Sequence, residues 1–143
     1  MRRKRADLKR FGKKYLLLYV GRISPEKGMR NMLDAMRQGL EEDCVLWIVG
    51  DGPMRENIDA EARKLDRPVV FWGYQRKDML YSVYTVCDCF ISASLSETYG
   101  QTINEALASG VLVAIPRSSG FSDAYGQFLN PTTCMWTPND TRD

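Results

Sequence analysis

The chain has 143 residues, of which 44% are hydrophobic, and a formal net charge of +2, values ordinary for a single globular domain. It contains no histidine, which excludes a Ser-His-Asp triad, a Cys-His pair and any histidine-ligated metal within these residues. The early apolar run Tyr15–Val20 is too short for a signal sequence or a membrane span. The four cysteines include no Cys-x-x-Cys pair, which favours reduced thiols. We therefore expect a cytoplasmic protein.

The first 14 residues form a basic segment that differs from the rest of the chain. They hold eight of the 20 lysines and arginines and one of the 18 acidic residues, which leaves 12 basic and 17 acidic residues, a net charge of −5, in residues 15–143. Leu8 and Phe11 are three residues apart, so we predict a short helix that ends at Gly12. Two interpretations stay open for residues 1–14: a solvated lead-in segment or linker, and a peripheral contact with an anionic membrane surface. We expect no nucleic-acid partner.

Apolar strands alternate with amphipathic helices along the remaining chain. Near-continuous apolar runs are typical of parallel strands buried on both faces, and the stretches between them carry apolar residues at helical spacing. We expect strands at 15–21, 45–49, 69–72, 88–92 and 111–115, a candidate sixth strand at 133–136, and helices at 29–38, 53–65, 77–86 and 98–109. This alternation predicts an α/β fold, a Rossmann-like parallel sheet flanked by helices with right-handed crossovers.

The unusual loops of the chain all follow strands. They are Gly21–Gly28, Gly50–Pro53, Gly73-Tyr74, Ser92–Gly100 and Arg117–Gly120. The links from helix to strand have no comparable glycine clusters. Because the loops after parallel strands all lie at the carboxyl ends of the strands, we expect these segments on one rim, where such sheets bind ligands.

The first of these loops carries two cations that suit a phosphate. Arg22 could bind two phosphate oxygens at once, and Lys27 could act as a point charge beside them. Because arginine and lysine are usually exposed to solvent, simple exposure stays an equal alternative for both side chains.

The stretch Ser92–Gly110 combines a strand end, a polar turn and a helix signal. Thr98 and Gln101 have capping-box spacing, and Gly110 is placed to end the helix in the left-handed conformation. Such a helix entrance offers free N–H groups and a positive dipole end to an anion. Glu97 and Glu105 lie on either side of it. A capping loop with surface glutamates stays open as the alternative.

Four motifs occur in an order and at a spacing that match a known family. They are Gly-Arg-Ile-Ser-Pro-Glu-Lys-Gly, Gly-Asp-Gly-Pro, Phe-Trp-Gly-Tyr and Ser-Glu-Thr-Tyr-Gly-Gln-Thr-Ile-Asn-Glu-Ala-Leu-Ala-Ser-Gly. From about Tyr15 to Asp123 the chain resembles the C-terminal, donor-binding domain of the family-four retaining glycosyltransferases, the glycosyl transferases group 1 of two-lobed GT-B architecture. It departs from the family at Ser119-Gly120, where relatives often have two glycines.

The resemblance implies a domain arrangement. Residues 15–143 would form a nucleotide-sugar-binding, Rossmann-like domain, one lobe of a GT-B fold that is truncated at its C-terminus, preceded by the basic segment 1–14. The acceptor-binding N-terminal domain would be absent from this chain. The enzyme would be a metal-independent, retaining hexosyltransferase that needs no cofactor and uses a UDP- or GDP-linked sugar. This lobe alone would be inactive or weakly active.

The resemblance also implies roles for individual residues. Arg22 and Lys27 would neutralise the diphosphate, and with Glu97, on the hydroxyls of the donor sugar, they form the catalytic set. Glu105 would accept hydrogen bonds from the ribose, and the stretch Trp72–Tyr74 would frame the base. The full set of nucleotide-sugar-binding residues would be Gly21, Gly50, Gly52, Trp72, Gly73, Tyr74, Tyr99, Gly100, Gln101, Thr102 and Glu105.

Two other functions stay open beside this one. The chain could be a non-catalytic nucleotide-binding module, or one that docks to a membrane or a partner through its basic segment. It could also be a glycoside hydrolase with Glu97 and Glu105 as its carboxylate pair.

Overall fold

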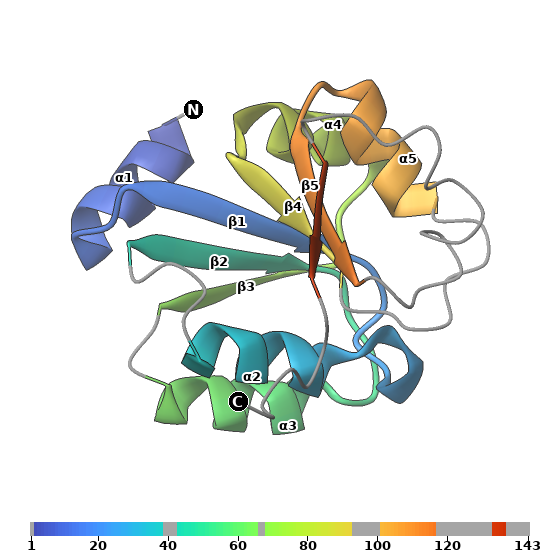
Figure 1. Ribbon diagram of the computed structural model, residues 1–143. Helices are drawn as coiled ribbons and strands as arrows, with labels where there is room; N and C mark the ends of the chain where they lie inside the picture. Colours follow the sequence, from blue (N-terminus) through green and yellow to red (C-terminus); the bar gives the residue numbers. More distant parts are fainter. Residues whose placement is uncertain (1, 39–42, 66–67, 93–100, 117–132, 137–143) are drawn as a thin grey trace.

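A six-stranded parallel sheet forms the centre of the molecule (Figure 1). The computed structural model describes residues 2–38, 43–65, 68–92, 101–116 and 133–136. The strands are β1 (Tyr15–Val20), β2 (Cys44–Val49), β3 (Val69–Gly73), β4 (Cys89–Ile91), β5 (Leu112–Pro116) and β6 (Thr133–Trp136). They lie in the order β3-β2-β1-β4-β5-β6, so the order reverses between β1 and β4, as in a Rossmann-like sheet. The predicted fold class and the candidate sixth strand are confirmed.

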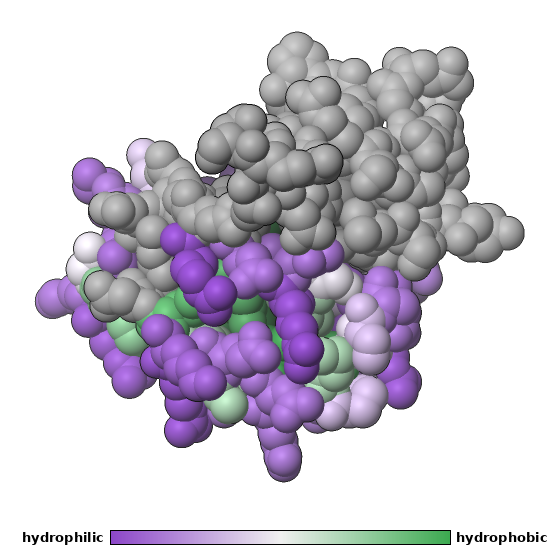
Figure 2. Space-filling view, turned by 60° about the horizontal axis from the view of Figure 1, so that its bottom comes forward, coloured by the Kyte–Doolittle hydropathy of each residue, from purple (hydrophilic) through white to green (hydrophobic). Residues whose placement is uncertain are grey.

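Helices cover both faces of this sheet (Figure 1). They are α1 (Arg2–Phe11), η1 (Pro25–Lys27), α2 (Met29–Gln38), α3 (Arg55–Lys64), α4 (Lys77–Val86) and α5 (Gln101–Ala108). Side chains alternate along β1, so Leu16 and Leu18 pack toward α1, α4 and α5, whereas Leu17 and Tyr19 pack toward α2 and α3. Seen from the α2 and α3 side, the surface of the described residues is mostly hydrophilic, with hydrophobic side chains gathered in a recess (Figure 2). In the part of the chain that the structure describes, no helix combines the length and the apolarity needed to cross a bilayer.

The ends of α5 and α3 show how loop contacts set helix boundaries. Gly110 has the left-handed conformation predicted for it (φ 76°), and its N–H donates to the Leu107 carbonyl while the Val111 N–H donates to the Ala106 carbonyl, a Schellman motif. The predicted cap at Thr98 lies outside the described residues. At α3 the helix begins at Arg55, later than predicted, and the Met54 N–H before it donates to the Ile23 carbonyl (3.0 Å), a contact between loops.

The loops after β1 and β2 lie in direct backbone contact. The Ile23 N–H donates to the Asp51 carbonyl at 2.9 Å. A Cβ atom on Gly50 would overlap the carbonyl oxygen of Gly21, and one on Gly52 would overlap the carbonyl oxygen of Ile23. Gly50 also has a positive φ of 140°, which side-chain-bearing residues rarely adopt. Glycine is therefore required at these two positions for the loops to approach this closely.

A buried carboxylate attaches α1 to the sheet. Asp7 is only 5% exposed and accepts hydrogen bonds from Trp47 Nε1 (2.9 Å) and Arg3 Nε (3.2 Å). Lys4 of the same helix forms an ion pair with Asp88 at 3.0 Å. The helix predicted to end at Gly12 is thus confirmed, and its inner face is bound to the domain by hydrogen bonds as well as by apolar packing.

We expect the substitution Gly50→Ala to destabilise the domain more than Gly12→Ala. Gly12 has a similarly unfavourable φ of 64° but open space around it, so its replacement carries only the backbone strain of about 1–2 kcal/mol. At Gly50 the overlap with Gly21 adds roughly 1–3 kcal/mol. Urea unfolding of both variants measures the two free energies, and equal losses would contradict the close contact.

We expect Asp7→Ala to lower the free energy of unfolding by about 1–3 kcal/mol, because the buried Trp47 N–H then loses its acceptor. The matched control is Asp34→Ala, which removes an exposed ion pair with Arg37 on α2 and should change stability by less than about 1 kcal/mol. Tryptophan fluorescence during urea unfolding follows both variants. An equal effect at the two positions would rule out a special contribution from Asp7.

Candidate functional site

Two neighbouring cavities open at the carboxyl edge of the sheet, and both are lined by Val20, Gly21 and Arg22. The first has a volume of about 320 Å³ and extends over β2 toward α4, and the second, of about 270 Å³, extends toward β4 and α5. They flank the point between β1 and β4 where strand order reverses, the place where parallel sheets of this kind bind ligands. The other lining residues are Val49, Gly50, Asp51, Tyr74, Gln75 and Leu80 in the first cavity, and Tyr19, Lys27, Ser92, Gln101 and Thr102 in the second.

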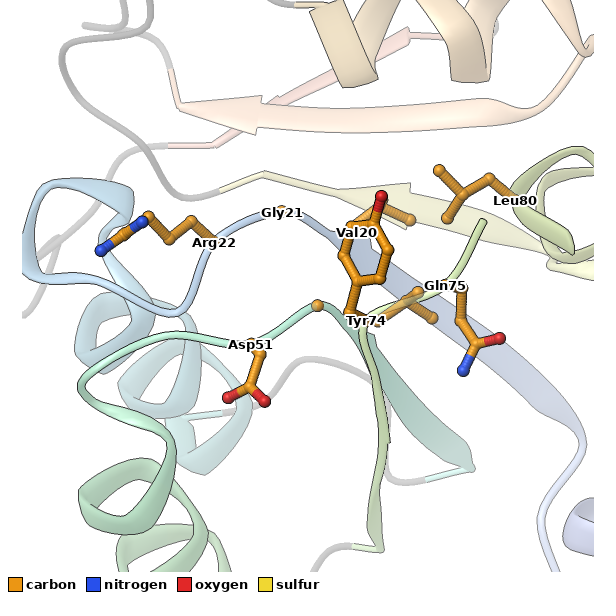
Figure 3. A pocket seen from close by; sticks show the side chains of 9 residues that line it. Val20, Gly21, Arg22, Asp51, Tyr74, Gln75 and Leu80 are labelled. Atoms are coloured by element: carbon orange, nitrogen blue, oxygen red, sulfur yellow. The ribbon is translucent and has the colours of Figure 1, made fainter. Parts of the chain in front are cut away.

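The first cavity has apolar walls and a polar rim (Figure 3). Val20, Val49 and Leu80 supply the apolar walls. The ring of Tyr74 stands at the opening and is 79% exposed, so one of its faces is available to a flat ligand. Gln75 lies beside it, and its Nε2 donates to a backbone carbonyl of β3, that of Trp72, at 3.0 Å.

Asp51, on the opposite rim of the first cavity, organises the loop after β2. Its Oδ1 accepts the Gly52 N–H at 2.8 Å, and its Oδ2 accepts from Arg55 Nη1 at 3.4 Å. The Arg55 guanidinium lies 5.9 Å from the centre of the Phe71 ring. The carboxylate therefore holds the glycine turn and the start of α3 together, and it also presents a negative charge to the rim of the cavity.

The second cavity brings two cations next to a helix entrance. Arg22 and Lys27 come from the loop after β1, and Gln101 and Thr102 are the first residues of α5. The first N–H groups of a helix lack intrahelical acceptors and carry the positive end of its dipole. Tyr19 Oη donates to the Arg22 carbonyl at 2.8 Å and so fixes the backbone that carries this arginine. The arrangement suits an anion with several oxygens, such as a diphosphate.

Glu105 lies one turn beyond Gln101 on α5, behind the second cavity, and its Oε2 accepts a hydrogen bond from Tyr84 Oη at 3.0 Å. Tyr84 is fully buried. Burial, and then the charge of Glu105, raise the pKa of Tyr84 far above its ordinary value, so the phenol stays protonated and remains a donor.

The structure brings together several of the residues that the sequence predicted. Gly21, Arg22, Gly50 and Tyr74 line the first cavity, and Arg22, Lys27, Gln101 and Thr102 line the second. Gly52 and Gly73 shape the same rim without lining either cavity; the Gly73 carbonyl accepts the Gly50 N–H at 2.9 Å. Glu97, Tyr99 and Gly100 lie outside the described residues. The proposed hydrolytic pair is therefore not tested, because the structure describes Glu105 but not Glu97.

Trp72 occupies a different place from the one expected. It does not line either cavity, because strand alternation turns its ring to the α1 side of β3. There it packs against Trp47, with 4.7 Å between ring centres, and under the Arg3 guanidinium at 5.3 Å. Its side chain therefore supports α1 and is not part of the wall that faces a ligand.

Sequence reasoning missed Asp51, Gln75 and Leu80 as lining residues. Asp51 stands between the two glycines of the second loop, and Gln75 directly follows Gly73-Tyr74, so both had a signal in their position next to a glycine turn. Leu80 had none, since it resembles any other apolar residue of an amphipathic helix. Within the described residues, no group of three or more Cys, Asp or Glu side chains is placed to hold a metal ion.

Comparison with known proteins gives a family match and similar folds. Residues 1–132 match the family model described as Glycosyl transferases group 1. The sulfoquinovosyl transferase SQD2 of Arabidopsis thaliana is 34% identical over 131 residues, which cover 91% of this chain and 25% of the relative. The chain spans about a quarter of the length of the curated relatives that it matches.

Two solved structures share the fold. The catalytic domain of cholesterol-alpha-glucosyltransferase from Helicobacter pylori superposes with a TM-score of 0.75 at 26% identity, over 90% of this chain and 80% of that one. Anabaena Alr3699/HepE in complex with UDP-glucose gives a TM-score of 0.75 at 19% identity, over 97% of this chain and 39% of that one. The second likeness concerns the fold alone.

Proposed function

The chain belongs to the glycosyl transferases group 1, and on that premise we propose that it is the donor-binding lobe of a retaining, metal-independent hexosyltransferase that uses a UDP- or GDP-linked sugar. The observation that carries this proposal is the meeting of Arg22, Lys27 and the entrance of α5 at the second cavity, beside the first cavity with its apolar walls. A nucleoside diphosphate has a part that suits each cavity: a charged diphosphate for the second and a flat base for the first. The Anabaena structure with UDP-glucose is consistent with such a ligand on this fold.

In this proposal the diphosphate occupies the second cavity. Arg22 and Lys27 neutralise its oxygens, and the N–H groups at the start of α5 add donors. Negative charge grows on the diphosphate as its bond to the sugar breaks. Cations and dipoles already directed at that position stabilise the transition state without reorganisation. Electrostatic stabilisation accelerates transfer most at this position, because the charge develops there.

The base then lies in the first cavity, between its apolar walls and the ring of Tyr74. Glu105 takes the ribose hydroxyls, and Glu97, Tyr99 and Gly100 contact the sugar. The acceptor is held by a second lobe, because transfer needs the acceptor aligned with the donor in a cleft that excludes water. We therefore expect this lobe alone to bind nucleotide but to transfer little sugar.

Isothermal titration calorimetry with UDP, GDP and ADP tests nucleotide binding by the full chain. We expect measurable binding of at least one of them, weakened by Arg22→Ala about tenfold or more through loss of charge-assisted hydrogen bonds. The control Arg63→Ala removes an exposed arginine of α3, paired with Asp59, and should leave the affinity unchanged. No heat with any of the three at millimolar concentration, or an equal effect of both substitutions, would contradict the proposal.

A second candidate function, docking to an anionic membrane surface, is favoured by the outer face of α1. Arg2, Arg5 and Lys9 recur at helical spacing and are exposed, while the acidic residue of this helix, Asp7, is buried on the inner face. We propose a cytoplasmic location as well, since four cysteines without a Cys-x-x-Cys pair favour reduced thiols.

Pelleting with phosphatidylserine vesicles tests the docking surface. The full chain should sediment with them at low salt and less at high salt, and replacing Arg2, Arg5 and Lys9 with alanine should weaken binding by about 1 kcal/mol per cation removed. Phosphatidylcholine vesicles are the control for charge. These substitutions spare the inner face of α1, so nucleotide affinity should not change. Equal sedimentation of the two proteins would exclude this surface.

A further inference from the structure

A buried tyrosine supports the carboxylate behind the two cavities. Tyr84 of α4 donates its hydroxyl to Glu105 Oε2 of α5 at 3.0 Å, and the two helices lie on the same face of the sheet (Figure 1). Tyr84 is fully buried, whereas Glu105 is partly exposed. One partner is thus fixed in the core, and the other reaches toward the surface.

The position of this pair relative to the cavities follows from helix geometry. Leu80 is one turn before Tyr84 on α4 and lines the first cavity. Gln101 and Thr102 are one turn before Glu105 on α5 and line the second. Residues three or four apart lie on the same side of a helix, so the hydrogen bond joins the two helices one turn behind the residues of α4 and α5 that line the cavities.

The chemistry of the pair favours a positioning role. A buried tyrosine hydroxyl is costly without a partner, and a phenylalanine would fill the same core space, packed on Phe90 with ring centres 5.9 Å apart. The hydroxyl does not ionise, because burial raises the pKa of Tyr84. It is a donor that occupies Oε2 of Glu105, while the second carboxylate oxygen keeps its own capacity to accept.

We propose that Tyr84 is a positioning residue that holds the Glu105 carboxylate toward the ribose hydroxyls of a bound nucleotide. The proposal rests on the proposed function, since it needs a nucleotide with its ribose next to α5. A glutamate loses rotamer freedom when it binds a ligand, and a carboxylate already held by Tyr84 has lost much of that freedom on folding. The gain in affinity should therefore depend on the ribose hydroxyls and on nothing else in the ligand.

The test compares Tyr84→Phe with the unsubstituted chain in calorimetric titrations of UDP and GDP, each beside its 2′,3′-dideoxy counterpart. We expect Tyr84→Phe to weaken binding of the ribonucleotide about two- to tenfold, the range of a single hydrogen bond, and to leave the dideoxy affinity unchanged. Tyr81→Phe is the matched control, because Tyr81 is an exposed tyrosine of the same helix, and it should change neither affinity.

Glu105→Ala separates this inference from the function on which it rests. It should weaken ribonucleotide binding at least as much as Tyr84→Phe does, and adding Tyr84→Phe to it should cause no further loss, since the two residues act as a unit.

Three results would overturn the inference. Equal losses for the ribose and dideoxy ligands in Tyr84→Phe would mean that Tyr84 supports only the fold. A ribose-specific loss in Glu105→Ala without one in Tyr84→Phe would refute the role of Tyr84 and keep that of Glu105. No ribose-specific loss in Glu105→Ala, or no nucleotide binding by the unsubstituted chain, would remove the ribose contact of the proposed function itself.

Discussion

The close approach of the loops after β1 and β2 is the constraint on which the candidate site depends. Their backbones touch where Gly50 faces the carbonyl of Gly21 and Gly52 faces that of Ile23, and no side chain fits between them. Hydrogen bonds between the two loops continue the pairing of the strands beyond the sheet. As a result, the backbone that carries Arg22 is held by its neighbours, which keeps the shared wall of both cavities in one place.

Charge is distributed over the domain in a way that fits this arrangement. The cations of the site come from one loop, and the entrance of α5 adds its dipole on the opposite side of the same cavity. Acidic groups near the site are engaged: Asp51 binds the glycine turn and Arg55, and Glu105 binds Tyr84. Asp51 adds a negative charge to the rim of the first cavity, and Glu105 lies one turn behind the second.

The sequence predicted the fold well because its signals are local. Apolar runs and helical spacing predicted α2 and α4 with the bounds that the structure has, and the loops after β1, β2 and β3 meet on one rim because parallel strands require it. Strand alternation alone could have placed Trp72 on the α1 side, but the motif around it favoured a ligand contact. The buried contacts of Asp7 with Trp47 and of Tyr84 with Glu105 join residues 40 and 21 positions apart, which no local pattern encodes.

The two cavities share the end of one strand, and this has a consequence for how a ligand is bound. A molecule with one part in each cavity is a bivalent ligand on a very short tether, so once the first part is seated, the second experiences a high effective concentration. The affinity for the whole molecule then exceeds the affinity for either part alone. Separate molecules that resemble only one part would therefore compete poorly with the whole ligand. A cell could hold abundant free phosphate and free bases without blocking such a site.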